Sequence, residues 1–109
     1  MDCIFCKIIK GEIPSAKVFD NEDVIAFNDI NPKARIHILI VPKKHIESVK
    51  HLQNTDKELI GDLVLAAKAI AEEKNLHGYK LVINVGREGG QIVDHLHLHL
   101  LSSDASKID

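Results

Sequence analysis

His95-Leu96-His97-Leu98-His99-Leu100-Leu101 is a run near the end of the chain in which histidine and leucine alternate strictly. A period of two residues is typical of a β-strand and differs from the 3.6-residue period of a helix, so we expect a strand over residues 94–101. Alternate side chains of a strand point to opposite faces of its sheet. The leucines should therefore lie against a core, and the three imidazoles should line the other face.

Two short apolar runs earlier in the chain predict a hairpin. Residues 16–20 and 23–27 lie on either side of the polar pair Asn21-Glu22, which favours a turn. Residues 28–33 combine Asn, Asp and Pro and predict a loop after the second strand.

Two further segments predict strands. Residues 36–41 form an apolar, β-branched run that includes His37, and they predict a buried central strand closed by Pro42. Residues 80–85 predict another strand, and the glycine-rich residues 86–91 predict a loop between it and the histidine run.

The clearest helix is expected from Thr55 to about residue 76. Thr55 and Glu58 have the spacing of a capping box, and Gly78 is a plausible stop signal. A shorter helical turn is expected at residues 46–49. Apolar residues recur at helical spacing along the long segment: Leu59, Ile60, Leu63, Val64, Ala67, Ile70 and Ala71.

These elements predict an α+β fold in one domain. Short links between strands favour antiparallel pairing, and the long helix should cover one face of the sheet. The chain of 109 residues shows no linker or repeat, so we expect a single domain over residues 1–109, with flexible ends at residues 1–2 and 102–109.

Composition excludes several classes of function. The formal net charge is -2, so the chain lacks the basic excess of a protein that binds nucleic acid through phosphates. It has no run of about 18 apolar residues that would span a membrane. Its first residues lack the layout of a secretory signal, so we expect a cytoplasmic protein.

Three alternating imidazoles leave three interpretations. They could be core histidines bonded to the backbone, although three together carry a large hydrogen-bonding demand. They could bind a metal, but the outer two Cα atoms of a regular strand are roughly 13 Å apart, too far to share one ion easily. They could act in nucleophilic catalysis at phosphorus, since histidine forms covalent intermediates and handles protons near neutral pH. Backbone N–H groups of residues 89–91, including Gly90 and Gln91, could then bind phosphate oxygens.

The run matches the H-φ-H-φ-H-φ-φ signature of the histidine triad family, in which φ is an apolar residue. The rest of the chain resembles the Hint branch of that family, the purine nucleoside phosphoramidases, over about residues 3–101. The resembling segments are residues 4–9, 11–14, 26–30 and 41–46, with Asn84 and residues 89–91 ahead of the triad. The resemblance implies a HIT-like fold with a five-stranded antiparallel sheet, one long helix and one short helix. It also implies a homodimer in which the two sheets run continuously and the long helix forms much of the interface.

The resemblance also implies roles for individual residues. His97 would be the nucleophile that becomes nucleotidylated, and His99 would contact phosphate or leaving-group atoms. His95 and His37 would orient His97, and Asp29 would bind the ribose hydroxyls. Positions that would line the nucleoside pocket are Ile4, Phe5, Phe27, Asn28 and Ile30, and positions that would contact phosphate are Asn84, Gly90, Gln91, Ile92 and Val93.

Several of these residues have a plainer interpretation as well. Asp29 could be a turn former ahead of Asn31-Pro32. Phe5, Phe27 and Ile30 could be core residues, and His37 in an apolar strand could be a core histidine with satisfied hydrogen bonds.

Three features depart from the Hint pattern. Ile92 stands where Hint enzymes usually carry a serine that assists the leaving group, and a hydrocarbon side chain cannot donate a proton. Asp94 precedes the triad where an aromatic residue is frequent. The chain after the triad continues Leu101-Ser102-Ser103 and ends at Asp109, without the longer tail of many members. These departures bear on the leaving group and the rate.

Cys3 and Cys6 form a C-x-x-C motif at the N-terminus. Two cysteines alone cannot complete a four-ligand zinc site, and without such a site they would be unpaired cytosolic thiols. A redox role is weaker, because no βαβ context accompanies the motif. Some histidine triad proteins bind zinc through such a pair, and the resemblance implies the ligands Cys3, Cys6, His45 and His95 here.

The leading hypothesis is an enzyme that cleaves P–N bonds, and mixed-anhydride bonds as a further possibility, at a purine nucleoside 5′-monophosphate through a nucleotidyl-His97 intermediate. The chemistry needs no cofactor, and zinc would be structural. One alternative is a dinucleoside polyphosphate hydrolase. Another is a nucleotide-binding adaptor with weak or no catalysis, which the isoleucine at position 92 motivates.

Overall fold

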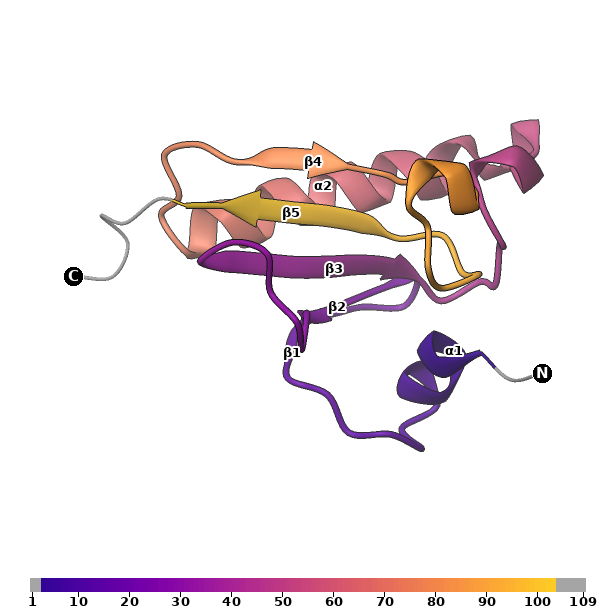
Figure 1. The fold of residues 1–109 in the computed structure, drawn as a ribbon, viewed down its shortest axis with the longest axis horizontal. Helices are drawn as coiled ribbons and strands as arrows, with labels where there is room; N and C mark the ends of the chain where they lie inside the picture. Colours follow the sequence, from indigo (N-terminus) through magenta and orange to yellow (C-terminus); the bar gives the residue numbers. More distant parts are fainter. Residues whose placement is uncertain (1–2, 104–109) are drawn as a thin grey trace.

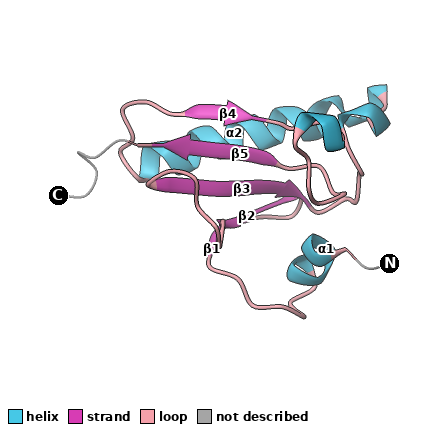
Figure 2. Cartoon of the chain, in the orientation of Figure 1, coloured by secondary structure: helices cyan, strands magenta, loops and turns pink. Residues whose placement is uncertain are grey.

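The computed structural model describes residues 3–103, so the prediction for residues 1–2 and 104–109 lies outside the described part of the chain. The sheet has the strand order β1-β2-β3-β5-β4, and every neighbouring pair is antiparallel. One long helix, α2, lies behind it (Figures 1 and 2). This confirms the predicted α+β fold with a five-stranded antiparallel sheet. The strands are β1 (Lys17–Asp20), β2 (Val24–Asn28), β3 (Ile36–Pro42), β4 (Lys80–Val82) and β5 (Leu98–Ser102).

The helical segments differ from the sequence predictions in their ends. The long helix α2 spans Lys57–Glu73, and a 3-10 turn at Asn54–Asp56 precedes it. The predicted capping by Thr55 is wrong, because Asp56 Oδ2 accepts the Gln53 N–H at 2.9 Å instead. The predicted stop at Gly78 is also wrong: Asn75 adopts φ 56 and the Leu76 N–H bonds back to the Ala71 carbonyl at 3.0 Å, which is a Schellman-type ending.

Three short helical segments complete the chain. Helix α1 spans Ile4–Ile9, and sequence periodicity did not predict it, since a single six-residue helix depends on packing and not on its own propensity. A 3-10 turn at Val49–His51 lies a few residues after the predicted helical turn at residues 46–49. Another 3-10 turn occupies Arg87–Gly89 in the glycine-rich loop. The described residues contain no helix long and apolar enough to cross a membrane.

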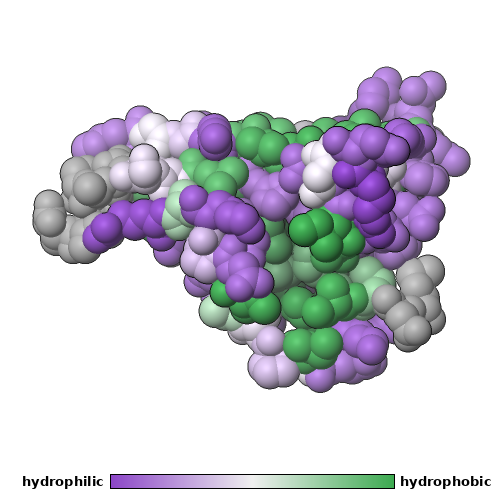
Figure 3. Space-filling view, viewed as in Figure 1, coloured by the Kyte–Doolittle hydropathy of each residue, from purple (hydrophilic) through white to green (hydrophobic). Residues whose placement is uncertain are grey.

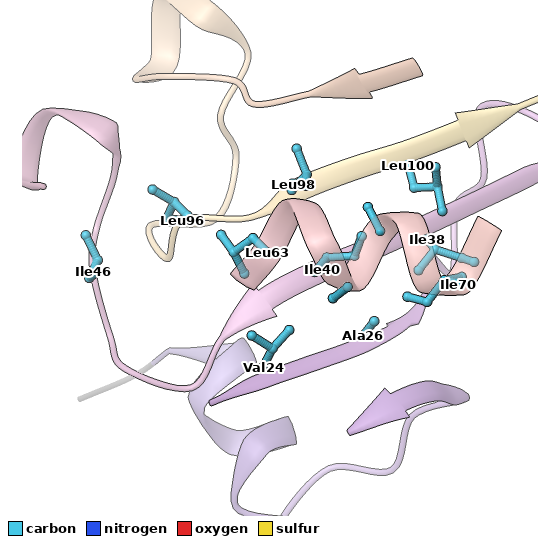
Figure 4. Close-up of a cluster of buried hydrophobic side chains, with 12 residues drawn as sticks. Val24, Ala26, Ile38, Ile40, Ile46, Leu63, Ile70, Leu96, Leu98 and Leu100 are labelled. Carbon is cyan, nitrogen blue, oxygen red and sulfur yellow. The ribbon is translucent and has the colours of Figure 1, made fainter. Parts of the chain in front are cut away.

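The face of the sheet under α2 forms the main core. Leu98 and Leu100 of β5, together with Leu96, pack there with Ile38 and Ile40 of β3 and with Leu63 and Ile70 of α2 (Figure 4). The leucines of the histidine run therefore face the core, as their alternation predicts. Burying this hydrocarbon surface is the main stabilising contribution to the fold.

The opposite face of the sheet carries a second cluster and the histidines. Ile25, Phe27, Leu39 and Val41 lie on it, and Phe5 of α1 packs against them. Strand β3 is thus apolar at every position except His37, because both of its faces are covered. In Figure 1, α1 stands off the sheet beside β2 and β3, on the side away from α2.

The last strand is shorter than the sequence predicts. It begins at Leu98 and not at residue 94, because the Leu96 N–H donates to the Ile46 carbonyl at 2.7 Å, outside the sheet. It also extends to Ser102, which is buried and donates to the Gly78 carbonyl at 2.7 Å, so the predicted flexible end at residue 102 is wrong. His95 and His97 therefore lie in an irregular segment that can turn each ring toward different partners.

Candidate functional site

His97 lies just before β5 and is buried. Its ring Nδ1 lies 2.7 Å from the backbone carbonyl of His95, and a carbonyl only accepts hydrogen bonds. The neutral ring therefore carries its proton on Nδ1, which leaves a lone pair on Nε2. Burial lowers the pKa of His97, so the ring is neutral at pH 7. The structure thus provides an imidazole nitrogen that is unprotonated and oriented by its other nitrogen.

His37 and His99 lie on the same face of the sheet, on the neighbouring strands β3 and β5. The backbone N–H of Lys33 donates to His37 Nδ1 at 3.0 Å, so neutral His37 carries its proton on Nε2. That nitrogen lies 2.9 Å from His99 Nδ1 and donates to it. Neutral His99 must then carry its own proton on Nε2. One backbone amide therefore fixes the tautomers of two rings.

Asn84 faces the end of this relay. Its side-chain amide lies 3.4 Å from His99 Nε2, which carries the proton. Because His99 Nε2 carries the proton, the Asn84 side-chain oxygen must face the ring in order to accept it. The hydrogen-bond network therefore selects this orientation of the amide over the flipped one. His99 Nε2–H is thus a hydrogen-bond donor that faces Asn84.

The electrostatics of this site keep its imidazoles neutral. Burial, together with the neighbouring rings of His97 and His37, lowers the pKa of His99 to about 4. Burial also lowers the pKa of His37, although the nearby Asp29 carboxylate opposes it. The ring centroids of His97 and His99 are 4.9 Å apart. The site therefore places a lone pair on His97 beside an N–H on His99, without a net charge on either.

Asp29 serves the loop and faces His37 at the same time. Its Oδ1 accepts the Asn31 N–H at 2.8 Å, which is the turn-forming role, while its Oδ2 lies 3.5 Å from His37 Nε2. Ile30, the next residue, is 91% exposed, so its alternative interpretation as a core residue is wrong. Asn28 is exposed at the end of β2. These residues lie near His37, where the nucleoside pocket is predicted.

Two aromatic rings form an apolar wall beside His97. Phe5 of α1 meets His97 edge-on with ring centroids 5.1 Å apart, and it meets Phe27 at 5.5 Å. Both phenylalanines are buried, so their core interpretation holds, and Phe5 also contacts the rings of His95 and His97. Ile4 on the outer side of α1 is exposed, and Figure 3 shows hydrophobic side chains gathered over and beside α1. Helix α1 therefore covers part of the site with apolar groups.

The glycine-rich loop is held in shape from inside by Gln91, which is 2% exposed. Its side-chain oxygen accepts the Gly86 N–H at 2.9 Å, and its amide donates to the carbonyls of Glu47 at 2.6 Å and Val93 at 3.0 Å. The Gln91 side chain is therefore occupied within the protein. Gly90, with φ 91, lies next to Asn84, where a Cβ would come within 3.7 Å of the Asn84 side chain.

The backbone N–H groups of the loop divide into used and free ones. Those of Gly89, Gly90 and Gln91 bond to carbonyls within the loop. Those of Ile92 and Val93 make no hydrogen bond to another residue within the range 3–103. Because Gly90 N–H is taken, the predicted phosphate contacts are best served by Ile92 and Val93.

A second group of side chains gathers around the N-terminal motif. Cys3, Cys6, His45 and His95 each present one ligand atom, and all four atoms lie within 4.8 Å of one another. The separations are 3.3 Å from Cys3 Sγ to His95 Nδ1, 3.3 Å from Cys6 Sγ to His45 Nδ1 and 3.0 Å between the two Nδ1 atoms. Ligands about 2.0–2.3 Å from a tetrahedral centre have separations of this order. The four residues fit a zinc ion.

The hydrogen bonding of His95 supports that fit. Its Nε2 lies 2.8 Å from the Pro42 carbonyl and must donate to it, which leaves the Nδ1 lone pair directed at the sulfurs. Burial lowers the pKa of His95 to about 4, so the ring is neutral, as a metal ligand must be. His95 contacts His97 through its carbonyl and not through its ring, which points toward the cysteines instead.

Asp29, His37 and His99 form a second group with ligand-like spacing. Here the arrangement does not fit a metal, because the Lys33 N–H occupies the Nδ1 lone pair of His37 and the proton on Nε2 points into the group. A metal at His37 Nε2 would require an imidazolate or the loss of the Lys33 hydrogen bond. The two groups therefore differ in function: Cys3, Cys6, His45 and His95 can bind a metal, whereas Asp29, His37 and His99 form a hydrogen-bonded relay.

Some residues that shape the site were not predicted from the sequence. Lys33 acts through its backbone, and Pro42 through its carbonyl, so no side-chain motif could have revealed them. Arg87 lies in the glycine-rich loop and pairs with Asp94 at 2.9 Å, and the departure at position 94 was the one signal for this pair.

Comparisons with known proteins agree with this arrangement. A family model described as "Scavenger mRNA decapping enzyme C-term binding" matches residues 2–108. Protein HitA of Neisseria gonorrhoeae is 41% identical over 103 residues, which cover 94% of this chain and 96% of that protein. A HIT family hydrolase from Legionella pneumophila Philadelphia 1 has 47% identity and a TM-score of 0.91, and the match covers 93% of this chain and 92% of that one. A histidine triad protein from Clostridium difficile has 47% identity and a TM-score of 0.90 over 93% and 90%.

The matched region includes the whole sheet, both α-helices and the histidine run. The relatives match at more than 30% identity and over nearly their full length, which a shared fold alone would not require. The chain therefore belongs to the histidine triad, or HIT, family.

Proposed function

We propose that the protein is a nucleotide hydrolase or transferase of the Hint branch, which cleaves the P–N bond of a purine nucleoside 5′-phosphoramidate. The observation that carries the proposal is the pair of opposite tautomers: His97 presents a lone pair, and His99, 4.9 Å away between ring centroids, presents an N–H. A nucleophile and a proton donor side by side are what cleavage of such a bond requires.

In the first step, His97 Nε2 forms a bond to the α-phosphorus and the P–N bond of the substrate breaks. The departing amine nitrogen takes the proton from His99 Nε2, which leaves the His99 ring as an imidazolate until the second step; the His37 Nε2–H bonded to its Nδ1 and the cationic His97 ring beside it stabilise that charge. The nucleotidylated His97 ring is cationic, and its Nδ1–H stays bonded to the His95 carbonyl, which stabilises that charge. Free N–H groups of Ile92 and Val93 supply donors for the phosphate oxygens.

In the second step, water attacks the same phosphorus. Its oxygen bonds to phosphorus, one of its protons returns to His99 Nε2, and the bond to His97 Nε2 breaks. The products are the nucleoside 5′-monophosphate and the free amine, and His97 regains its lone pair. Asp29, exposed Ile30 and the wall formed by Phe5 and Phe27 would hold the nucleoside.

The test is release of AMP from adenosine 5′-phosphoramidate, with His97→Ala as the inactive variant. His51→Ala is a matched control, because His51 is half exposed and pairs with Glu47 at 3.2 Å, away from the histidine row. We expect turnover by the wild type and by His51→Ala and none by His97→Ala. Equal inertness of all three folded proteins would exclude catalysis.

Two other activities remain alternatives to be compared in the same assay. A nucleotide-binding adaptor is favoured by Ile92, which is 80% exposed and has no side-chain proton to give. It would bind AMP in a calorimeter without turning over any substrate. A dinucleoside polyphosphate hydrolase would prefer dinucleoside polyphosphates to the phosphoramidate, so both substrates belong in the panel.

A zinc ion is proposed as a structural element at Cys3, Cys6, His45 and His95. When bound, zinc would crosslink the start of α1 to the segments that carry His45 and His95. Cys3 also caps α1, since its sulfur accepts the Cys6 N–H at 3.3 Å. Zinc would therefore stabilise the wall that Phe5 forms beside His97.

The protein is also proposed to form a homodimer. The edge strand β4 and helix α2 carry exposed large hydrophobic residues. They are Val64 and Leu65 of α2, Leu81 of β4, and Tyr79 just before β4. Pairing two β4 edges would cover both features. We expect Leu81→Glu combined with Leu65→Glu to convert a sedimenting dimer to a monomer, whereas a wild-type monomer would refute the proposal.

A further inference from the structure

The glycine-rich loop is held from outside by Arg87, which no part of the proposed mechanism uses. Its Nη1 donates to the Gln91 carbonyl at 2.6 Å and lies 2.9 Å from Asp94 Oδ1, and its Nη2 donates to Asp94 Oδ2 at 3.0 Å. One guanidinium thus binds the residues on both sides of Ile92 and Val93. The bidentate contact with Asp94 fixes the plane of the guanidinium.

The bond to Gln91 has a directional consequence. All peptide bonds of the described residues are trans, and in a trans peptide the C=O and the N–H point in opposite directions. The Gln91 carbonyl and the Ile92 N–H belong to one peptide unit. Holding the carbonyl at Arg87 therefore turns the Ile92 N–H away from the guanidinium.

The loop is also held from its inner side. The side-chain amide of Gln91 donates to the Val93 carbonyl at 3.0 Å, which fixes the peptide between Val93 and Asp94. The loop has left-handed glycines at Gly86, with φ 72, and Gly90, with φ 91, and would otherwise have many conformations. The N–H groups of Ile92 and Val93, which have no partner among residues 3–103, lie in the part of the loop held from both sides.

We infer that Arg87 is a positioning residue that aims the Ile92 N–H at a phosphate oxygen of the substrate, with Asp94 holding the guanidinium in place. The inference rests on the proposed function for the identity of the ligand. It assigns a role to the Arg87–Asp94 pair and to the backbone of Ile92, whose side chain offers no donor. Three of the five guanidinium N–H groups bond to Asp94 and to the Gln91 carbonyl, and the role assigned to Arg87 is exerted through the Gln91–Ile92 peptide.

The test compares the doubly neutral variant Arg87→Gln/Asp94→Asn with the wild type. Removing one positive and one negative charge leaves the local net charge unchanged, so a lower affinity reports lost positioning and not lost attraction. The matched control is Lys68→Gln/Glu72→Gln on α2, an ion pair at 2.9 Å with side chains 61% and 67% exposed, against 62% and 60% for Arg87 and Asp94.

We expect the loop variant to bind AMP about threefold to tenfold more weakly, with the melting temperature unchanged and with the control variant equal to wild type. KM for the phosphoramidate should rise more than kcat falls. In NMR spectra, the Ile92 amide signal should shift on AMP binding in the wild type and shift less in the variant.

Hydrogen exchange keeps the inference separate from the proposed function. If Arg87 positions the loop, the amides of Gly89, Gly90 and Gln91 should exchange faster in the loop variant, whether or not AMP binds. Unchanged exchange, or unchanged AMP affinity in a protein that does bind AMP, would overturn the inference. If the wild type binds no AMP, but the loop amides exchange faster in the variant than in the wild type, the proposed function is refuted and the positioning of the loop by Arg87 is retained.

Discussion

Two clusters that combine histidines with cysteine or aspartate side chains lie on the same face of this protein. They differ in whether the histidine directs a lone pair or an N–H group into the cluster. In the first, Cys3, Cys6, His45 and His95 surround a point that His95 Nδ1 faces with a lone pair, because its Nε2–H is given to the Pro42 carbonyl. In the second, Asp29, His37 and His99 surround a point that His37 faces with an N–H, because its Nδ1 accepts from the Lys33 backbone. Spacing alone would assign a metal to both.

The difference teaches that a histidine's function is set by the partner behind the ring. A carbonyl behind the ring frees a lone pair in front, which suits a metal or an electrophilic phosphorus. An amide N–H behind the ring directs a proton to the front, which suits a leaving group. His97 follows the first rule through the His95 carbonyl, and His99 follows the second through His37.

The largest expected effect is on metal affinity. Cys6→Ser should lower zinc affinity by about a hundredfold or more, because it removes one of four ligands, while His37→Ala should leave it unchanged. Elemental analysis of protein purified without added zinc measures both. A wild type with less than about 0.1 zinc per chain, or a loss in His37→Ala equal to that in Cys6→Ser, would break the distinction between the clusters.

The second expected effect is on the rate. His99→Leu removes the proposed proton donor and should lower kcat for the phosphoramidate about a hundredfold, with the zinc content of the protein unchanged. Steady-state kinetics and elemental analysis of the same preparation check the two halves. A kcat within about threefold of wild type would mean that the proton comes from elsewhere.

The third effect is a loss of stability in acid. The pKa of His99 in the folded protein is about 4, below the ordinary value of 6.5. Above pH 6.5 neither state holds this proton. As the pH falls from about 6.5 to 4, the unfolded chain takes up a proton that the folded protein does not, so stability declines. Urea unfolding at pH 7 and pH 5 should show a decline about 2 kcal/mol smaller in His99→Leu than in the wild type. Equal declines would contradict the depressed pKa.

The smallest effect concerns the end of the relay. Asn84→Leu removes the acceptor for His99 Nε2–H and should lower kcat about fivefold, since one neutral hydrogen bond orients the donor. Asn84→Asp keeps an acceptor, and its negative charge should raise the pKa of His99 and move the acid limb of the pH–rate profile upward. The profile of kcat between pH 4 and 8 distinguishes the two variants, and identical profiles would remove Asn84 from the relay.

Most of the sheet could be predicted because its pattern is local. Alternation assigned Leu96, Leu98 and Leu100 to the core, and the hairpin signals located β1 and β2 within a residue or two. The errors lie where distant contacts override local pattern. Residues 94–97 leave the sheet because Leu96 bonds to Ile46. Helix α2 ends at Glu73, two residues before Asn75, because Asn75 and not Gly78 takes the left-handed conformation.

The candidate site was predicted in part for the same reason. Residue types named the imidazoles and the thiols, and the structure brings Cys3, Cys6, His45 and His95 together as the resemblance implied. Sequence periodicity did not predict helix α1, since six residues carry too little of it, yet α1 is the element that puts Phe5 against His97. The link between Arg87 and Asp94 spans seven residues of an irregular loop, which no periodic pattern describes.

The sequence by itself determined which side chains face the core and which chemical groups stand opposite, because a two-residue period follows from the geometry of every strand. Only the tertiary structure decided which nitrogen of each imidazole carries the proton. That choice depends on the Pro42 carbonyl, 53 residues from His95, and on His37, 62 residues from His99. Neutral imidazole can place its proton on either nitrogen, so the partner that the fold places behind each ring makes one histidine a ligand, another a nucleophile and a third a donor.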